Sequence, residues 1–142
     1  MSAQLASFPS DQPRDTAVVT VLRPRQALAD QRSSRRVCLS PKYGRGPLEI
    51  EVRYLWRGAP DAPTVIVQGG ISADRDVVGE PGGKAGWWQE LVGEGRALDL
   101  QRCRVLSIDW LTPADLGDGQ AAAVSSEDQA DALAALVDAL GI

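Results

Sequence analysis

Histidine is absent from this sequence of 142 residues. Without an imidazole, the chain cannot by itself supply a Ser-His-Asp or Cys-His catalytic unit, nor a histidine ligand for a metal. Lys42 and Lys84 are the only lysines, and they are the remaining nitrogen bases with an accessible pKa. Nucleophilic catalysis that depends on an imidazole would therefore need a residue from outside this sequence.

Cysteine is scarce. Cys38 and Cys103 lie far apart in the sequence, which is neither a disulfide framework nor a CxxC pair. Both have apolar neighbours, so we expect two buried, reduced thiols. No calcium loop or other group of residues has the spacing of a metal site, and no metal is expected.

Long apolar runs are also missing, and none approaches the roughly 20 residues that a helix needs to cross a bilayer. The first residues lack the basic and apolar regions of a secretory signal. We therefore expect a cytoplasmic chain with no membrane partner. The net charge of −4 disfavours a protein that follows nucleic acid phosphates, so no nucleic acid partner is expected.

Charge and composition divide the sequence into two parts. Residues 1–36 carry six arginines against three aspartates, together with three prolines and no sustained periodicity. This composition predicts a flexible basic N-terminal arm, which is more often a solvated tail than a contact for an acidic partner. Ordered structure is expected over residues 37–142.

Apolar periodicity predicts four strands. Residues 37–40 form a short strand candidate, and residues 48–56 alternate apolar and charged side chains, as in a half-buried strand. These two strands resemble an antiparallel hairpin at the edge of a sheet. Residues 64–70 and 102–111 contain consecutive apolar side chains, which is typical of central strands covered by helices on both faces.

Two helices are expected. Residues 86–95 form a short helix candidate in which one of the adjacent indoles of Trp87 and Trp88 packs inward, while the other lines a loop or a cavity. The second helix is the clearer one. Ser126 and Gln129 stand at the spacing of a capping box, and Gly141 supplies a C-cap. Its expected apolar stripe consists of Ala130, Leu133, Ala134, Val137 and Leu140.

The number of expected helices is too small for the number of central strands. Two central strands need helices on both faces, whereas the sequence offers one long helix and one short helix. Residues 37–142 are therefore predicted to form an incomplete α/β domain. Its sheet is expected to be mixed, with antiparallel leading strands followed by parallel strands and helices.

A glycine-rich loop, QGGISADRD, follows the first predicted central strand. Gly69 and Gly70 permit a sharp turn at the carboxyl end of a strand, where open parallel sheets bind ligands, and they leave N–H groups free to face an anion. An ordinary structural turn is the alternative. GxGxxG and GxxxxGK[ST] are absent, so neither a dinucleotide fingerprint nor a P-loop is indicated. The carboxylates of the two loops, at 74, 76, 80, 115 and 118, are interpreted as solvated charges.

Several segments of the sequence resemble the homoserine O-acyltransferase family. They are LEIEVRYLWRG, VIVQGGISAD, GWWQELVGEGRALDLQRCRVLSID and EDQADALAALVDALGI. The resemblance covers about residues 37–142 and implies the N-terminal half of an α/β-hydrolase fold. It also implies transfer of an acetyl or succinyl group from acyl-CoA to the hydroxyl group of homoserine, or of serine, in methionine biosynthesis.

The resemblance also implies which residues act. Family members use a backbone N–H group in the loop after the first central strand as part of the oxyanion hole, and the matching residues here are Ile71 and Gly70. Ser72 and Trp88 are candidates for contact with the substrate. The nucleophilic serine, the aspartate and the histidine of the family are expected beyond Ile142, so this chain alone is expected to be inactive. No cofactor is expected to be bound, since acyl-CoA is a co-substrate.

Implied partners are the amino-acid substrate, acyl-CoA and a complementary C-terminal chain, with a homodimer for the complete enzyme. Two other functions remain open. The chain could be a small α/β module that binds an anion without catalysis, or half of an esterase of the α/β-hydrolase fold.

Overall fold

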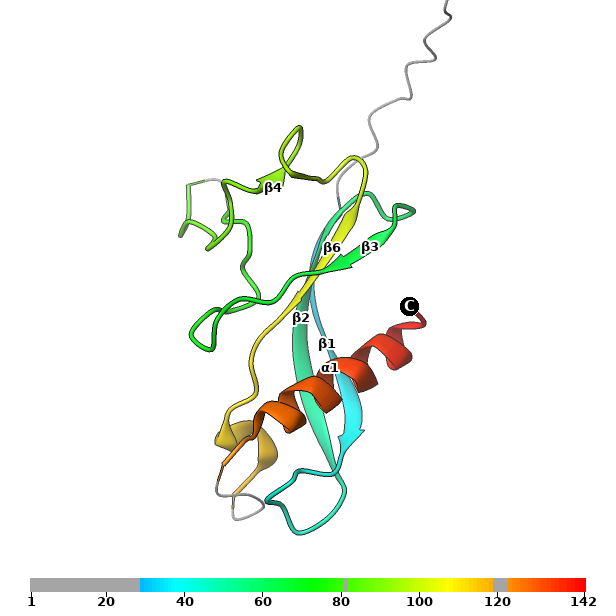
Figure 1. The fold of residues 1–142 in the computed structure, drawn as a ribbon, viewed down its shortest axis with the longest axis vertical. Coiled ribbons are helices and arrows are strands. Elements are labelled where there is room, and N and C mark those ends of the chain that lie inside the picture. Colours follow the sequence, from blue (N-terminus) through cyan, green and yellow to red (C-terminus); the bar gives the residue numbers. More distant parts are fainter. Residues whose placement is uncertain (1–28, 81, 119–122) are drawn as a thin grey trace, which may run out of the picture.

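A four-stranded sheet with the strand order β1-β2-β6-β3 forms the centre of the structure (Figure 1). The strands are β1 (Ala29–Leu39), β2 (Leu48–Gly58), β3 (Thr64–Ile66) and β6 (Arg104–Ile108). β2 is antiparallel to both β1 and β6, whereas β3 and β6 are parallel. The predicted mixed sheet with antiparallel leading strands is confirmed. This computed structural model describes residues 29–80, 82–118 and 123–142.

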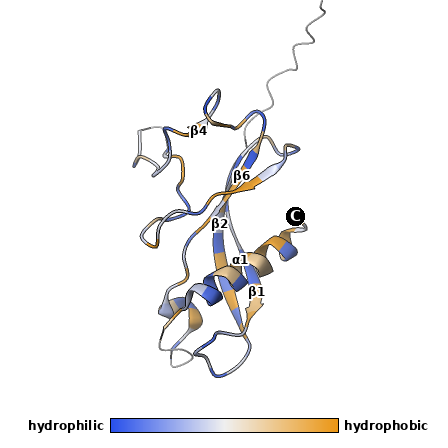
Figure 2. Cartoon of the chain, in the orientation of Figure 1, coloured by the Kyte–Doolittle hydropathy of each residue, from blue (hydrophilic) through white to orange (hydrophobic). Residues whose placement is uncertain are grey.

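The antiparallel hairpin of β1 and β2 is confirmed at one edge of the sheet. Hydrophobic and hydrophilic residues alternate along β2 (Figure 2), and Ile50, Val52, Tyr54 and Trp56 are buried. β1, however, begins at Ala29 and not near residue 37, because its polar first part pairs with the far end of β2. Residues 1–28 of the expected arm lie outside the described residues.

The two predicted central strands differ in the structure. β6 lies between β2 and β3, with Val105 buried on one face and Leu106 on the other, as expected. β3 is only three residues long and lies at the edge of the described sheet. The expectation of a fully covered central strand is wrong for β3, since Ile66 remains 41% exposed.

The helix expected over residues 86–95 is not formed. Turns lead there into β4 (Val92–Gly93), which pairs in parallel with β5 (Leu98–Asp99). Glycines at both ends of this short segment disfavour a helix. Trp87 packs inward against Val77 and its apolar neighbours, as predicted for one of the two indoles, whereas Trp88 is exposed.

Helix α1 (Ser126–Leu140) confirms the predicted C-terminal helix, and Gly141 ends it in the left-handed conformation. Its N-cap is Ser125, whose hydroxyl accepts from the Asp128 N–H, so the capping box expected for Ser126 and Gln129 is wrong by one residue. The Gln129 side chain instead makes hydrogen bonds with the backbone of Leu111.

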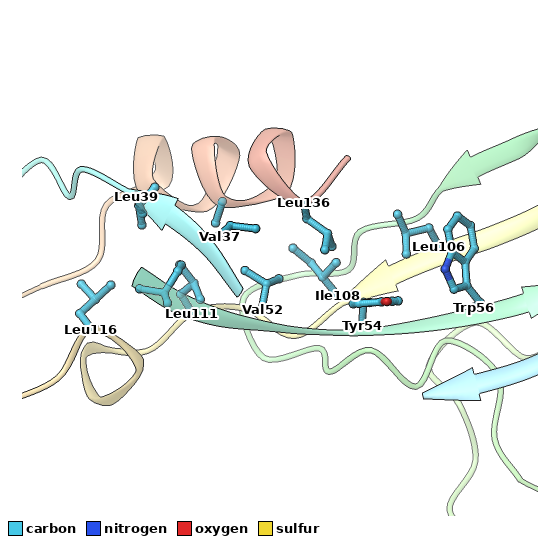
Figure 3. Close-up of a cluster of buried hydrophobic side chains, with 12 residues drawn as sticks. Val37, Leu39, Val52, Tyr54, Trp56, Leu106, Ile108, Leu111, Leu116 and Leu136 are labelled. Atoms are coloured by element: carbon cyan, nitrogen blue, oxygen red, sulfur yellow. The ribbon is translucent and has the colours of Figure 1, made fainter. Parts of the chain in front are cut away.

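The buried face of α1 also differs from the expected stripe. Ala132 and Leu136 are fully buried, whereas Ala130 and Ala134 are exposed. Leu136 packs on the sheet with Val52, Tyr54 and Ile108 (Figure 3). A short 3-10 turn, η1 (Pro113–Leu116), closes one end of this core with Leu116.

A second, smaller core covers the other face of β6 and β3. It contains Val67, Val77, Val92, Leu100 and Val105, and the segment between β3 and β6 supplies the first four of them from loops, turns and a short strand. Loops therefore cover this face where helices were expected.

Both cysteines are free thiols. Cys38 is exposed on β1, which corrects the expectation that it is buried, and Cys103 is half-buried. Burial raises the pKa of the Cys103 thiol, and the charge of Asp99 raises it further. Among the described residues, no helix is long and apolar enough to cross a bilayer.

Candidate functional site

The glycine-rich loop leaves the sheet at the carboxyl end of β3. The Val67 N–H still donates to the Leu106 carbonyl at 2.8 Å, which anchors the first residue of the loop beside β6. A turn follows, in which the Ala73 N–H donates to the Gly70 carbonyl at 2.8 Å. Gly69 has no room for a side chain there, because a Cβ atom would overlap the Cβ of Ala73 and lie 3.2 Å from the Trp87 ring.

Side chains from outside the loop hold its carbonyl groups. Trp110 Nε1 donates to the Gly70 carbonyl at 2.8 Å, and Trp87 Nε1 donates to the Asp74 carbonyl at 2.8 Å. The buried Ser107 hydroxyl donates to the Arg75 carbonyl at 2.5 Å. The loop is therefore held mainly through its acceptors.

The donors at the tip of the loop are free. In the described part of the chain, the N–H groups of Gly70 and Ile71 donate to no protein acceptor. The Ile71 side chain is exposed. A turn with bound carbonyls and free N–H groups suits an oxygen atom that carries negative charge.

Two adjoining cavities open beside this turn. The first has a volume of about 400 Å³ and lies between the loop and the first turns of α1. It is lined by Gln68, Ile71, Trp110, Val124, Ser125, Ser126, Gln129, Ala130 and Leu133. The second, of about 500 Å³, extends toward Asp109 and Thr112 and shares Ile71 and Trp110 with the first. Ile71, one of the two residues with a free N–H group, thus lines both of these mostly apolar cavities.

A network of ion pairs lies behind the loop. Asp109 Oδ2 accepts from Arg75 at 2.8 Å and from Arg53 Nε at 3.0 Å, and Arg53 also pairs with Asp115 at 3.1 Å. The hydrogen bond to Asp109 raises the pKa of Arg53 despite its partial burial. Burial would raise the pKa of Asp115, but hydrogen bonds from Thr112 and the Arg53 charge lower it.

Several carboxylates expected to be solvated are in fact paired. Asp115 binds Arg53, Asp74 binds Lys84 at 3.1 Å, and Asp76 binds Arg32 at 2.8 Å. Burial would raise the pKa of Asp74, but hydrogen bonds from Lys84 and the Asp76 N–H lower it. Asp76 thus joins the loop to β1, and Asp115 joins η1 to β2.

The predicted substrate residues lie in different places. Ser72 lines the second cavity next to Ile71. Trp88 stacks at a tilt on Trp87, with 5.3 Å between ring centroids, and lines neither of the two cavities. Among the described residues, no group of three or more His, Cys, Asp or Glu side chains could hold a metal ion.

Sequence reasoning missed the residues that hold the loop. Ser107, Asp109 and Trp110 all lie at the end of β6, which is adjacent to β3 in the sheet. The sequence did contain a signal for these contacts. The residues are polar and lie at the carboxyl end of a predicted parallel strand, where the ends of neighbouring strands meet at one edge of a sheet.

The chain is similar in sequence to a curated relative. It is 45% identical over 106 residues to homoserine O-succinyltransferase of Xanthomonas campestris pv. campestris, and the match covers 72% of this chain. The chain spans about a quarter of that relative, since the match covers 27% of its length. No protein-family model matches the chain.

Solved structures share the fold. Esterase E22 superimposes with a TM-score of 0.64 at 18% identity and covers 80% of this chain and 38% of its own. Homoserine O-acetyltransferase from Bacillus anthracis gives a TM-score of 0.64 at 18% identity, over 80% of this chain and 37% of that chain. The homoserine O-acetyltransferase from Staphylococcus aureus gives 0.62 at 19% identity, over 79% and 36%. Together, the sequence similarity and the partial α/β-hydrolase fold match part of a homoserine O-acyltransferase.

Proposed function

We propose that this chain forms part of an enzyme that transfers an acyl group from acyl-CoA to the hydroxyl group of homoserine, in methionine biosynthesis. The observation that carries the proposal is the turn after β3, where Gly70 and Ile71 have free N–H groups and Ile71 lines an apolar cavity. Acyl transfer needs such donors, because a tetrahedral intermediate places negative charge on the former carbonyl oxygen. One donor of this kind contributes roughly 3 to 4 kcal/mol to lowering the barrier.

The reaction we propose has two halves. A serine hydroxyl attacks the thioester carbon, its proton passes to a base, and the C–S bond breaks as CoA leaves as the protonated thiol. The homoserine hydroxyl then attacks the acyl-serine, its proton passes to the same base, and the serine oxygen leaves and regains a proton. In both halves, the Ile71 N–H would donate to the oxyanion.

The serine and its base would come from a complementary polypeptide segment, either in a continuous chain or in a separate one. Two features support a docking place for it beside β3. Ile66 is exposed at the outer strand, and the Gln68 Oε1 atom just beyond it is buried without a hydrogen-bond partner in the described structure. Without this segment, we expect the chain to be inactive. We expect the complete enzyme to be a homodimer, which light scattering would measure.

The experiment begins with the DNA downstream of codon 142, where a reading frame with a serine elbow between a strand and a helix is expected. The purified chain is then assayed for CoA release from acetyl-CoA and succinyl-CoA, alone and mixed with that polypeptide. We expect continued release only from the mixture, and only with homoserine present. Without homoserine, the mixture should release about one CoA per active serine, because only the first half of the reaction can occur. Turnover by the chain alone would refute the expected inactivity.

Control reactions separate the other functions. Thioester hydrolysis without homoserine would identify an esterase, and serine in place of homoserine tests the acceptor. A mixture that folds but releases no CoA would favour the alternative function, a module that binds an anion without catalysis. In an active mixture, Ile71→Pro removes the N–H donor and should reduce kcat by about 100-fold or more. The matched Ile71→Val variant keeps the donor and should retain activity within a few fold.

A further inference from the structure

Asp109 binds the glycine-rich loop in two ways at once. Its Oδ1 atom accepts from the Arg75 N–H at 2.8 Å, and its Oδ2 atom accepts from the Arg75 guanidinium at 2.8 Å. The same Oδ2 atom accepts from Arg53 Nε of β2 at 3.0 Å. One carboxylate thus joins the backbone of the loop to the sheet.

The position of Asp109 is itself fixed. It follows directly after β6, and its own N–H donates to the Arg53 carbonyl at 3.0 Å. The side chains of Asp109 and Arg75 are 21% and 23% exposed, so solvent screens their contact less than it screens a surface ion pair. Hydrogen bonds between charged groups are also shorter and stronger than those between neutral groups.

The first half of the loop contains two adjacent glycines, and its hydrogen bonds to the protein are made at the Gly70 carbonyl. Gly69 and Gly70 lack side chains and can adopt many backbone conformations. Beyond the Val67 hydrogen bond to β6, the loop is next joined to the sheet by Trp110 at Gly70, and then by Ser107 and Asp109 at Arg75. The Ile71 N–H lies in the same planar peptide group as the Gly70 carbonyl, which accepts from Trp110 and from the Ala73 N–H. The position of this peptide group relative to the sheet therefore depends on the hold at Gly70 and on the hold at Arg75, where the turn ends.

We propose that Asp109 is a positioning residue that fixes the direction of the Ile71 N–H group. The inference rests on the oxyanion role proposed above for that group. An oxyanion donor acts by being oriented before the reaction, and a displacement of about 1 Å in an active site can cost about 100-fold in rate. Asp109 itself touches no reacting atom in this role.

The test uses NMR on the ¹⁵N-labelled chain. The variants Asp109→Ala and Asp109→Asn are compared with Asp115→Ala and Asp115→Asn. Asp115 is the matched control, because it belongs to the same ion-pair network through Arg53 but makes no hydrogen bond to residues 69–76. The urea unfolding of each variant is measured in parallel, so that general destabilisation is known.

In the parent chain, we expect an order parameter of about 0.85 at the Ile71 amide, falling below about 0.6 in Asp109→Ala. Hydrogen exchange at the Arg75 amide should become about 10- to 100-fold faster in that variant. Asp109→Asn keeps one acceptor for the Arg75 N–H and should fall between the two. The Asp115 variants should leave both readouts unchanged.

Titration with sodium acetate tests directly whether the Ile71 N–H can donate to a carboxylate. A role of Asp109 in stability alone would not change this response. The Ile71 amide signal should shift in the parent chain and in the Asp115 variants, and shift less in the Asp109 variants. An Ile71 amide that stays ordered in Asp109→Asn, or that loosens equally in Asp115→Asn, would overturn the inference. Both of these results come from the asparagine variants, so the test remains decisive even if Asp109→Ala does not fold.

The two proposals fail in different ways. The NMR measurements need no enzymatic turnover. If the order of the loop depends on Asp109 but no CoA is released, the positioning role stands and the proposed function fails. Acyl transfer that survives loss of Asp109 with an ordered Ile71 amide would reject only the positioning role.

Discussion

Gln129 and Leu111 are joined by two reciprocal hydrogen bonds. The Leu111 N–H donates to Gln129 Oε1 at 2.9 Å, and Gln129 Nε2 donates to the Leu111 carbonyl at 2.8 Å. Both residues are buried. A side chain of α1 thus satisfies both backbone polar groups of a residue in the segment after β6, as a neighbouring strand would.

Replacing Gln129 with leucine should therefore be costly. Q129L leaves the buried N–H and carbonyl of Leu111 without partners, and we expect a loss of about 2 to 4 kcal/mol in the free energy of unfolding. Urea unfolding followed by circular dichroism measures this loss. Gln89→Leu is the control, because the Gln89 side chain makes no hydrogen bond in the described structure. Equal effects of the two substitutions would contradict the assigned role.

Asp128 should make stability depend on acid pH. Its carboxylate is buried and accepts from the N–H groups of Ser125 and Lys42, both at 2.7 Å. Burial would raise the pKa of Asp128, but these hydrogen bonds outweigh it and hold the pKa below the usual value of 3.8. The resulting stabilisation is complete above the pKa of the unfolded chain, and it is lost as the pH falls through the lower pKa of the folded chain.

The measurement is the free energy of unfolding between pH 7 and pH 3. We expect Asp128→Asn to be less stable at pH 7 by about 1 to 3 kcal/mol and to lose less stability on acidification than the parent chain. Asp131→Asn, at an exposed position on the same helix, serves as the comparison. Parallel profiles for the parent and Asp128→Asn would show that Asp128 is not responsible.

The two adjacent glycines of the loop should respond differently to alanine. A Cβ atom at Gly69 would overlap the Cβ of Ala73 and press on the Trp87 ring, whereas a Cβ atom at Gly70 would meet open space. We expect Gly69→Ala to cost about 1 to 3 kcal/mol and to change the Trp fluorescence, with Gly70→Ala close to neutral. A harmless Gly69→Ala would mean that the loop is less closely packed than described.

The two thiols should differ in reactivity. Cys38 is exposed, whereas Cys103 is half-buried, its S–H donates to the Asp99 carbonyl at 3.3 Å, and burial raises its pKa. Alkylation by iodoacetamide at pH 8 should be at least about tenfold faster at Cys38. Mass spectrometry of the two peptides measures the rates, and Cys38→Ser should leave one slow thiol. Similar rates in the parent chain would count against the described burial.

Leu136 should contribute strongly to the packing of α1 on the sheet. Its side chain is fully buried among the residues of Figure 3, so Leu136→Ala should cost about 2 to 5 kcal/mol. The same substitution at Leu91, which is 44% exposed, should change stability by about 0.5 kcal/mol or less. Urea unfolding of the two variants gives the comparison directly.

Local patterns predicted the elements that depend on local chemistry. Alternation of apolar and charged residues was sufficient for β2, and a serine cap followed by Gly141 was sufficient for the existence of α1. The cap was misplaced by one residue because Ser125 with Asp128 and Ser126 with Gln129 offer the same spacing. A distant contact decides between them, since Gln129 is held by Leu111.

Pairing between distant segments accounts for what the sequence did not predict. The polar first part of β1 has no apolar alternation, and it becomes a strand because β2 extends far enough to pair with it. At the site, the turn after β3 was predicted from its glycines. The contacts of Asp109 and Ser107 with Arg75 were not, because they join residues 34 and 32 positions apart in the sequence.

The outer edge of β3 has a consequence for handling the purified polypeptide. Within the described residues, Thr64–Ile66 pairs on one side only, and Ile66 adds an exposed apolar side chain. An uncovered edge of this kind can template the addition of strands from other molecules, which is how edge-to-edge aggregation begins. Turbidity should therefore rise with protein concentration, and the charged side chain of Ile66→Lys should delay this rise.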